Sequence, residues 1–189
     1  MPDKNLLEER SNEFDRVVSN CIFSDQEGNK FGAEPGIQNT LNVLQSAKER
    51  KASVYVVGNG GSAAVASHIL TDFINVAGLR ASVLHDPSLL TCMTNDYGYE
   101  NAFSNVLKKI GSTNDVLIAI SSSGNSMNIR NAASCMKEIG GEVITLTGFA
   151  EDNFLRQMGD LNIWLNSSRY GLVEIGHLFL LHHLSDRLA

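Results

Sequence analysis

Short runs of continuous apolar residues constrain the fold of this chain more than any other feature. The clearest are residues 54–57, 116–120 and 143–146, and weaker runs lie at residues 81–84 and 161–165. Most of them are separated by segments with the spacing of amphipathic helices. Strands whose two faces are both covered by helices have this pattern. We therefore predict an α/β fold with a doubly wound, five-stranded parallel sheet.

Helical patterns flank the predicted sheet on both sides in the sequence. Residues 6–18 repeat apolar side chains at helical spacing, and a second helix includes the apolar residues between 37 and 44. Residues 22–36, which contain several glycines and a proline, are predicted to form a loop. The last helix spans about residues 170–188. We expect one domain over residues 1–189, with two N-terminal helices in residues 1–50 and the α/β core with the C-terminal helix in residues 51–189.

Composition and charge exclude several classes of protein. The formal net charge of −6 disfavours general binding to nucleic acids. No apolar stretch approaches the roughly 20 residues that a membrane span requires, and the charged opening, residues 1–5, lacks the apolar core of a signal peptide. The three cysteines have neither metal-binding nor redox spacing. We expect a cytoplasmic protein that binds neither nucleic acid nor membrane.

Two polar loops follow the apolar runs at residues 54–57 and 116–120, and each loop precedes a predicted helix. Residues 58–62 read GNGGS, in which the glycines let the backbone approach a ligand closely. Residues 121–126 read SSSGNS and supply hydroxyl and amide donors that suit a phosphate. Helix starts add unpaired N–H groups and a partial positive charge. A single loop of this kind is explained equally well as a capped turn, but two at corresponding strand ends predict a ligand cleft.

A dinucleotide site is the rival interpretation of the first loop. Residues 58–63 formally fit the pattern G-x-G-x-x-[GA], and Asp86 follows the next predicted strand. This interpretation does not account for the serine loop, whose hydroxyl density suits a phosphomonoester better than a dinucleotide. We therefore expect a phosphorylated sugar as ligand and no nucleotide cofactor.

Three motifs together resemble the signatures of the phosphoheptose isomerases in the SIS-domain superfamily. They are GNGGS at residues 58–62, TNDYGY at residues 94–99 and SSSGNS at residues 121–126, in family-like order and spacing. The resemblance runs from about residue 54 to the end of the chain. It implies a single SIS domain with a flavodoxin-like sheet, and a homo-oligomer, commonly a tetramer, with sites built between subunits. The activity it implies is the isomerisation of sedoheptulose 7-phosphate to a heptose 7-phosphate for a bacterial surface glycan.

The resemblance also assigns roles to residues of this chain. Four serines would hold the phosphate: Ser121, Ser122, Ser123 and Ser126. Residues of the other two motifs would contact the sugar, namely Asn59, Gly60, Gly61, Asn95 and Asp96, and Ser62 adds a hydroxyl to the first loop.

Four further residues form the candidate catalytic and metal-binding group. His68 and Asp72 share one face of the helix after the first loop, and Glu174 and His182 lie eight residues apart on the last helix. Nitrogen and carboxylate ligands suit a divalent metal. Some members of the family bind zinc at these positions, where a glutamate and a glutamine usually stand in place of Asp72 and Glu174. The resemblance thus implies a divalent ion, zinc by expectation.

The expected chemistry is an aldose–ketose shift through an enediol. Asp72 or Glu174 is the expected base, and His182 is the expected acid. The alternative is a non-catalytic sugar-phosphate-binding module of the same superfamily, such as a replication-initiator-binding assembly factor or a sugar-phosphate sensor. The acid and base residues present here argue against a pure scaffold, and we expect no DNA-binding domain, which argues against a regulator.

Overall fold

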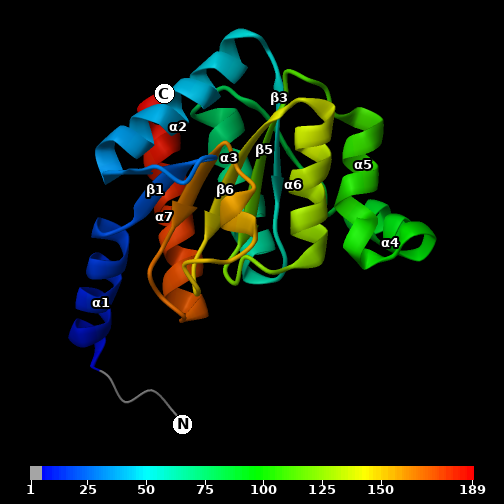
Figure 1. Ribbon diagram of the computed structural model, residues 1–189. Coiled ribbons are helices and arrows are strands. Elements are labelled where there is room, and N and C mark those ends of the chain that lie inside the picture. Colours follow the sequence, from blue (N-terminus) through cyan, green and yellow to red (C-terminus); the bar gives the residue numbers. More distant parts are fainter. Residues whose placement is uncertain (1–5) are drawn as a thin grey trace.

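The computed structural model describes residues 6–189 and contains one mostly parallel sheet (Figure 1). The charged opening, residues 1–5, lies outside the described residues. Five strands run parallel, in the spatial order β4 (Arg80–Val83), β3 (Ser53–Val57), β5 (Val116–Ser121), β6 (Glu142–Thr147) and β7 (Leu161–Trp164). Numbered along the chain this is the order 2-1-3-4-5 of flavodoxin-like sheets, so the predicted fold class is confirmed.

The prediction of a loop over residues 22–36 was wrong. Two antiparallel strands, β1 (Ile22–Asp25) and β2 (Lys30–Phe31), extend the sheet beyond β7, and α2 (Ala33–Glu49) has already begun at residue 33. The glycines that suggested a loop serve tight packing and a turn instead. Gly28 has φ +85° in the turn of the hairpin. A Cβ on Gly36 would lie 2.1 Å from Cγ of Phe23, so only glycine lets α2 approach β1 this closely.

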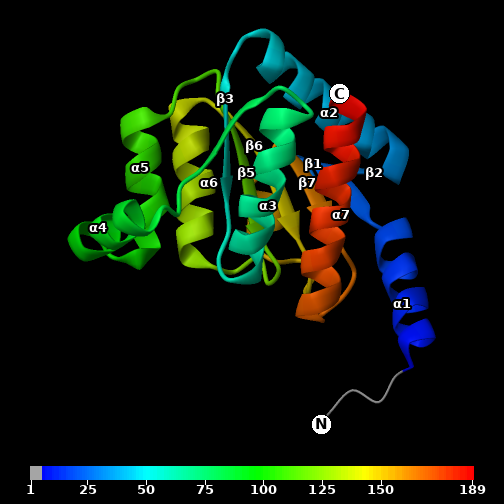
Figure 2. The ribbon, with the colours of Figure 1, turned by 180° about the vertical axis from the view of Figure 1, so that it is seen from behind.

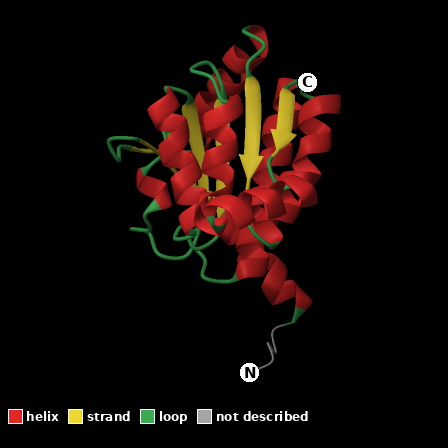
Figure 3. Cartoon of the chain, turned by 90° about the vertical axis from the view of Figure 1, so that its right-hand side faces the viewer, coloured by secondary structure: helices red, strands yellow, loops and turns green. Residues whose placement is uncertain are grey.

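Helices cover both faces of the sheet (Figure 3). Figure 2 shows α3 (Gly61–Asn75) and α7 (Tyr170–Leu188) side by side on one face, which α2 also covers. The other face carries α6 (Met127–Ile139) and α5 (Ala102–Ile110), with α4 (Pro87–Tyr97) and the short η1 (Tyr99–Asn101) at its edge (Figure 1). The helix α1 (Leu7–Ser19) contacts α7 and extends away from the body of the molecule (Figure 1). A short helix, η2 (Leu155–Gln157), lies in the β6–β7 connection.

Alternating side chains of the strands divide the core in two. Val54 and Val56 of β3 are buried in the cluster beneath α2, α3 and α7, whereas Tyr55 and Val57 are buried in the cluster beneath α5 and α6. Successive strand residues point to opposite faces, so a strand between two helix layers must be apolar throughout. This requirement explains the continuous apolar runs of the sequence. Within residues 6–189 there is no helix that combines the length and apolar character needed to cross a bilayer.

The chain reverses its winding direction between β3 and β5. It leaves β3 through α3 towards β4 on one side and returns to β5, which pairs with the opposite edge of β3. The loops after these two strands therefore diverge above the sheet and leave a crevice at its carboxyl edge. The two polar loops singled out in the sequence are these two loops.

One buried histidine of α7 makes the stability of the fold depend on pH. His177 is fully buried, and its Nε2 donates a hydrogen bond of 3.1 Å to the carbonyl oxygen of Thr147, which can only accept. Its Nδ1 has no hydrogen-bond partner among the described residues. Burial lowers the pKa of His177 from 6.5 to about 4, and the hydrogen bond to Thr147 offsets this only in part.

We expect the folded state to lose stability as the pH falls from about 6.5 to about 4. In this window the unfolded chain binds a proton at residue 177 and the folded chain does not, so the loss amounts to about 3 kcal/mol. His177→Gln keeps an N–H donor but does not titrate, and its unfolding free energy should depend less steeply on pH. Urea unfolding of both proteins at several pH values checks this. Parallel pH profiles would contradict it.

Candidate active site

A cavity of about 220 Å³ occupies the crevice between the two polar loops. Its lining contains residues of the first loop (Asn59, Gly60, Gly61 and Ser62), of the second loop and the strand before it (Ile120, Ser121, Ser122, Ser123 and Ser126), and of α7 (Tyr170 and Glu174). Nine of these eleven residues are ones that the sequence singled out, and the structure brings them around one space. Ile120 and Tyr170 are the additions.

Two helices begin at the cavity and direct their N-termini to it. The helix α3 starts at Gly61 behind an N-cap glycine, Gly60, with φ +53°. The helix α6 starts behind Ser126, whose hydroxyl makes no capping bond to its own helix. The unpaired N–H groups and partial positive charges of both helix starts therefore face the same space, which favours an anionic ligand.

The serine loop contains a buried hydroxyl with nothing to bind. Ser122 is 5% exposed, and its Oγ has no hydrogen-bond partner within residues 6–189. The other serines have contacts inside the loop, because Ser123 Oγ accepts from the N–H of Asn125 at 3.2 Å and Ser121 Oγ donates to Ser126 Oγ at 3.4 Å. A buried hydroxyl that lines a polar cavity without a partner indicates a site for a ligand with acceptor oxygens.

Glu174 places a carboxylate on the opposite wall of this cavity. A Cβ on Gly61 would lie 2.3 Å from both carboxylate oxygens of Glu174, so the absence of a side chain at residue 61 makes room for this carboxylate. The N-terminus of α3 stabilises a negative charge at this position. The cavity thus combines donors on the serine side with one proton acceptor on the α7 side.

Tyr170 was missed because aromatic residues at a helix start carry no catalytic pattern. Its ring packs edge-on against Phe149, with ring centroids 4.8 Å apart. Phe149 holds φ +57°, an unusual conformation for a bulky residue. The useful signal in the sequence was position, since Tyr170 opens the helix that follows the last strand and therefore starts at the same edge of the sheet as the polar loops.

Three of the four predicted catalytic and metal-binding residues gather between α3 and α7. His182 Nδ1 lies 2.6 Å from Asp72 Oδ2, and the rings of His68 and His182 meet edge-on with centroids 5.0 Å apart. The side chains of His182 and Asp72 are 34% and 28% exposed, so solvent or a ligand reaches this cluster. Asp72 holds the imidazole of His182 in one orientation.

The arrangement of the four residues does not form a metal site. Across the described part of the chain, no group of three or more histidine, cysteine, aspartate or glutamate side chains is placed to hold a metal ion. The carboxylate of Glu174 lies beside Gly61. His182 is eight residues further along α7, which corresponds to a rise of about 12 Å along the helix axis. Asp72 also engages one ring nitrogen of His182. We therefore derive no catalytic step through a metal.

Two predicted sugar-binding residues lie outside the cavity. Asn95 and Asp96 are exposed on α4, where Asn95 Nδ2 donates to Asp96 Oδ1 at 2.9 Å. Among the remaining histidines, His85 lies 2.7 Å from Ser67 Oγ through its Nε2, and His183 is exposed on α7. Burial lowers the pKa of His85.

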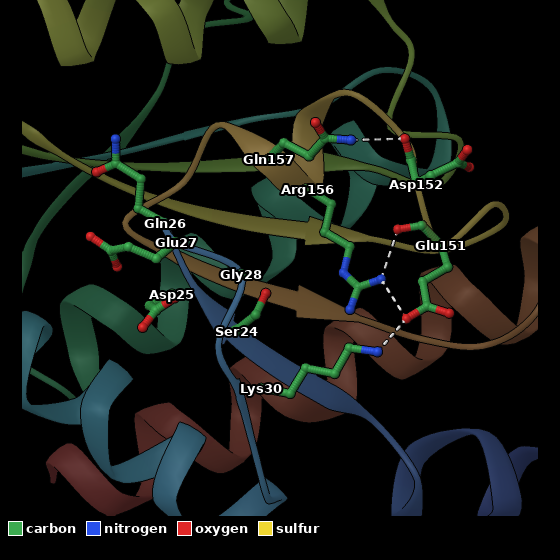
Figure 4. A pocket seen from close by; sticks show the side chains of 10 residues that line it. All are labelled: Ser24, Asp25, Gln26, Glu27, Gly28, Lys30, Glu151, Asp152, Arg156 and Gln157. Atoms are coloured by element: carbon green, nitrogen blue, oxygen red, sulfur yellow. Dashed lines mark hydrogen bonds and ion pairs between the residues drawn. The ribbon is translucent and has the colours of Figure 1, made fainter.

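A larger cavity of about 590 Å³ lies at the hairpin of β1 and β2 (Figure 4). Three of its charged side chains pair with one another, since the Glu151 carboxylate accepts from Lys30 at 2.7 Å and contacts Arg156 at 3.3 Å. These two partners lower the pKa of Glu151, with Lys30 the larger cause. The crevice at the carboxyl edge has an unpartnered donor and two helix starts, whereas both cations of this cavity, Lys30 and Arg156, are already bound to Glu151, so we assign the site to the crevice.

Comparison with known proteins identifies a family and relatives that match most of the chain. The model of the family described as "SIS domain" matches residues 27–148. A phosphoheptose isomerase of Helicobacter pylori (strain Shi470) is 32% identical over 78% of this chain and 79% of that protein. A phosphoheptose isomerase of Thiobacillus denitrificans is 34% identical over 91% of this chain and 92% of that protein.

Solved structures are similar over nearly the whole chain. The phosphoheptose isomerase of Neisseria gonorrhoeae matches with a TM-score of 0.81 and 29% identity, over 97% of this chain and all of that one. The phosphoheptose isomerase of Francisella tularensis matches with a TM-score of 0.83 and 25% identity, over 96% and 93% of the two chains.

Proposed function

The chain belongs to the SIS domain family, and on this premise we propose that it is a phosphoheptose isomerase, which converts sedoheptulose 7-phosphate to a heptose 7-phosphate. The observation that carries this proposal is the crevice cavity, in which the unpartnered hydroxyl of Ser122 and two helix starts face the carboxylate of Glu174. The donors suit a phosphate, and the carboxylate suits a proton transfer. By family resemblance, the product would serve a bacterial surface glycan.

We propose that the substrate is bound by its two ends. Its phosphate, at carbon 7, would lie on Ser121, Ser122, Ser123 and Ser126. The carbonyl is at the other end of the carbon chain, so the reacting carbons would lie away from the serine loop and towards the α3–α7 wall. Glu174 at the cavity, and the pair of Asp72 and His182 further along the same two helices, are the acid and base groups on that wall.

The proposed reaction moves a proton between neighbouring carbons. A carboxylate removes the proton from the carbon beside the carbonyl, and an enediol forms as the carbonyl oxygen takes up a proton. The reverse steps on the neighbouring carbon complete the shift from ketose to aldose. Glu174 and Asp72 are both candidate bases: the carboxylate of Glu174 lines the cavity, whereas that of Asp72 lies beside His182. His182, oriented by Asp72, is our proposed acid.

The test is an isomerase assay with sedoheptulose 7-phosphate in deuterium oxide. Turnover with incorporation of deuterium at the carbon beside the carbonyl would support proton transfer by the protein. Binding of the sugar phosphate without turnover would instead favour the non-catalytic binding module. The sequence predicts zinc at His68, Asp72, Glu174 and His182, an arrangement that these described side chains do not form, and metal analysis of the purified protein tests that prediction.

We propose that the protein is a homo-oligomer, a tetramer by family resemblance, in which the N- and C-terminal helices pack across subunits. Support comes from apolar side chains that remain exposed on these helices: Leu7 of α1, and Ile175 and Phe179 of α7, are 83%, 59% and 52% exposed. Light scattering should give a mass several times that of one chain, and Phe179→Lys should shift it downwards. A monomer at micromolar concentration would contradict the proposal.

A further inference from the structure

Asn128, at the start of α6, holds the two ligand loops together. Its amide forms a reciprocal pair with the amide of Asn59: Asn59 Nδ2 donates to Asn128 Oδ1 at 2.9 Å, and Asn128 Nδ2 donates to Asn59 Oδ1 at 2.8 Å. Asn128 is 3% exposed and follows the serine loop, whereas Asn59 lies in the glycine loop 69 residues earlier. The pair therefore bridges the crevice below the ligand cavity.

The third sequence motif reaches the same atom. The hydroxyl of Tyr99, the last residue of the TNDYGY motif, donates to Asn59 Oδ1 at 2.7 Å. One carbonyl oxygen thus receives donors from Tyr99 of the TNDYGY motif and from Asn128, two residues after the serine motif. Two motifs and the start of the helix that follows the third thus meet at the side chain of Asn59, although the chain separates them widely.

A backbone group fixes which way these amides face. The N–H of Ile129 donates to Asn128 Oδ1 at 3.0 Å, and a backbone N–H can only donate. The atom of Asn128 at this position must therefore be the oxygen, and its nitrogen must face Asn59. The atom of Asn59 that receives this nitrogen must be an oxygen in turn. These hydrogen bonds alone therefore fix the positions of the oxygen and nitrogen atoms in both amides.

This orientation limits what Asn59 can offer a ligand. Its Oδ1 already accepts two hydrogen bonds, and its Nδ2 has used one of two N–H groups. The side chain, which lines the cavity, therefore has one N–H donor left and no acceptor. A ligand oxygen fits this position, and a ligand donor does not.

We propose that Asn128 is a positioning residue of the sugar-phosphate site, which orients the Asn59 amide so that it presents an N–H donor to the sugar. The identity of the ligand in this proposal rests on the proposed function, whereas the hydrogen-bond geometry does not depend on it. Asn128 acts through Asn59 and does not itself line the cavity. Substitution of Asn128 should therefore lower kcat/KM only when the Asn59 side chain is present.

The test is a double-mutant cycle on kcat/KM for sedoheptulose 7-phosphate. Asn128→Asp keeps the shape and the acceptor for Ile129 but places an oxygen against Asn59 Oδ1, and we expect it to lower kcat/KM about tenfold. In an Asn59→Ala background the same change should alter kcat/KM less than twofold, because the group it positions is gone. An equal tenfold loss in both backgrounds would overturn the proposal.

Two further variants separate positioning from stability. Tyr99→Phe removes only a hydroxyl from a side chain that is 45% exposed, so it should fold normally and lower kcat/KM about threefold. Asn162→Asp is the matched control: this buried amide bonds to Thr145 and Gly159, away from the cavity, and should lower stability while leaving kcat/KM unchanged. An unchanged kcat/KM in Tyr99→Phe and in Asn128→Asp would reject the positioning role.

The failure of the proposed function is distinguishable from the failure of this inference. If the wild type binds sedoheptulose 7-phosphate without turnover, the isomerase proposal fails and the same cycle is measured as dissociation constants, with the same expected pattern. If the wild type binds neither this sugar phosphate nor inorganic phosphate, both proposals are overturned.

Discussion

His182→Ala is expected to lower kcat about 1,000-fold while sugar-phosphate binding changes little. A positioned proton donor contributes about a hundredfold to ten-thousandfold to such a reaction, and His182 is held for this role by Asp72 at 2.6 Å. The proposed phosphate contacts lie on the serine loop, and His182 does not line that cavity, so affinity should survive. The measurement is kcat for sedoheptulose 7-phosphate together with a dissociation constant from calorimetry.

The neighbouring histidine supplies the control for this prediction. His183→Ala removes an exposed imidazole from the same helix and should leave kcat unchanged. Asp72→Asn should lower kcat in the same direction as His182→Ala, because it removes the carboxylate that lies 2.6 Å from His182 Nδ1 and orients the imidazole. If kcat stays near the wild-type value in His182→Ala, the proton donor lies elsewhere.

Ser122→Ala is expected to weaken sugar-phosphate binding about 10- to 100-fold without destabilising the protein. A hydrogen bond to a charged group contributes about 1.5–3 kcal/mol, which gives this range. The Oγ of Ser122 is buried and has no partner in the part of the chain described, so its removal takes nothing from the free protein. Most losses of a buried polar group lower both binding and stability, and this one should lower binding alone.

Ser185→Ala is the matched control for the phosphate site. Ser185 is 0% exposed, and its Oγ likewise has no partner among residues 6–189, but it lies near the end of α7. Its removal should leave both the affinity and the melting temperature nearly unchanged. Equal affinity of the wild type and Ser122→Ala, or equal binding of sedoheptulose and its 7-phosphate, would reject our assignment of the phosphate to this loop.

The base can be identified by comparing two carboxylates. Glu174→Gln removes the charge from the cavity wall, and Asp72→Asn removes it from the pair with His182. The family usually has a glutamine where this chain has Glu174, and a glutamate where it has Asp72. If Glu174→Gln remains active, Glu174 is not the base, and Asp72 is left as the candidate; if Glu174→Gln is inactive, Glu174 is the base, because Asp72→Asn is expected to lower kcat in either case through His182.

The sequence by itself determined the layers of the fold and the loops of the site. Apolar runs such as residues 116–120 indicate strands covered on both faces, because neighbouring residues of a strand face opposite layers. A glycine or serine loop between such a strand and a helix must lie at the carboxyl edge of the sheet. These inferences need only neighbours in the chain, which is why the parallel sheet and both polar loops were predicted.

Only the tertiary structure decided which distant residues meet. Along α7, Glu174 faces the cavity, His177 is buried beneath the sheet edge, His182 pairs with Asp72 and His183 faces solvent, although all four are polar residues of one apolar helix. The strand pairing of residues 22–25 and the bond between Asn59 and Asn128 were likewise invisible in the sequence. Such contacts depend on strand order and helix rotation, which bring together groups many residues apart, and no local pattern carries that information.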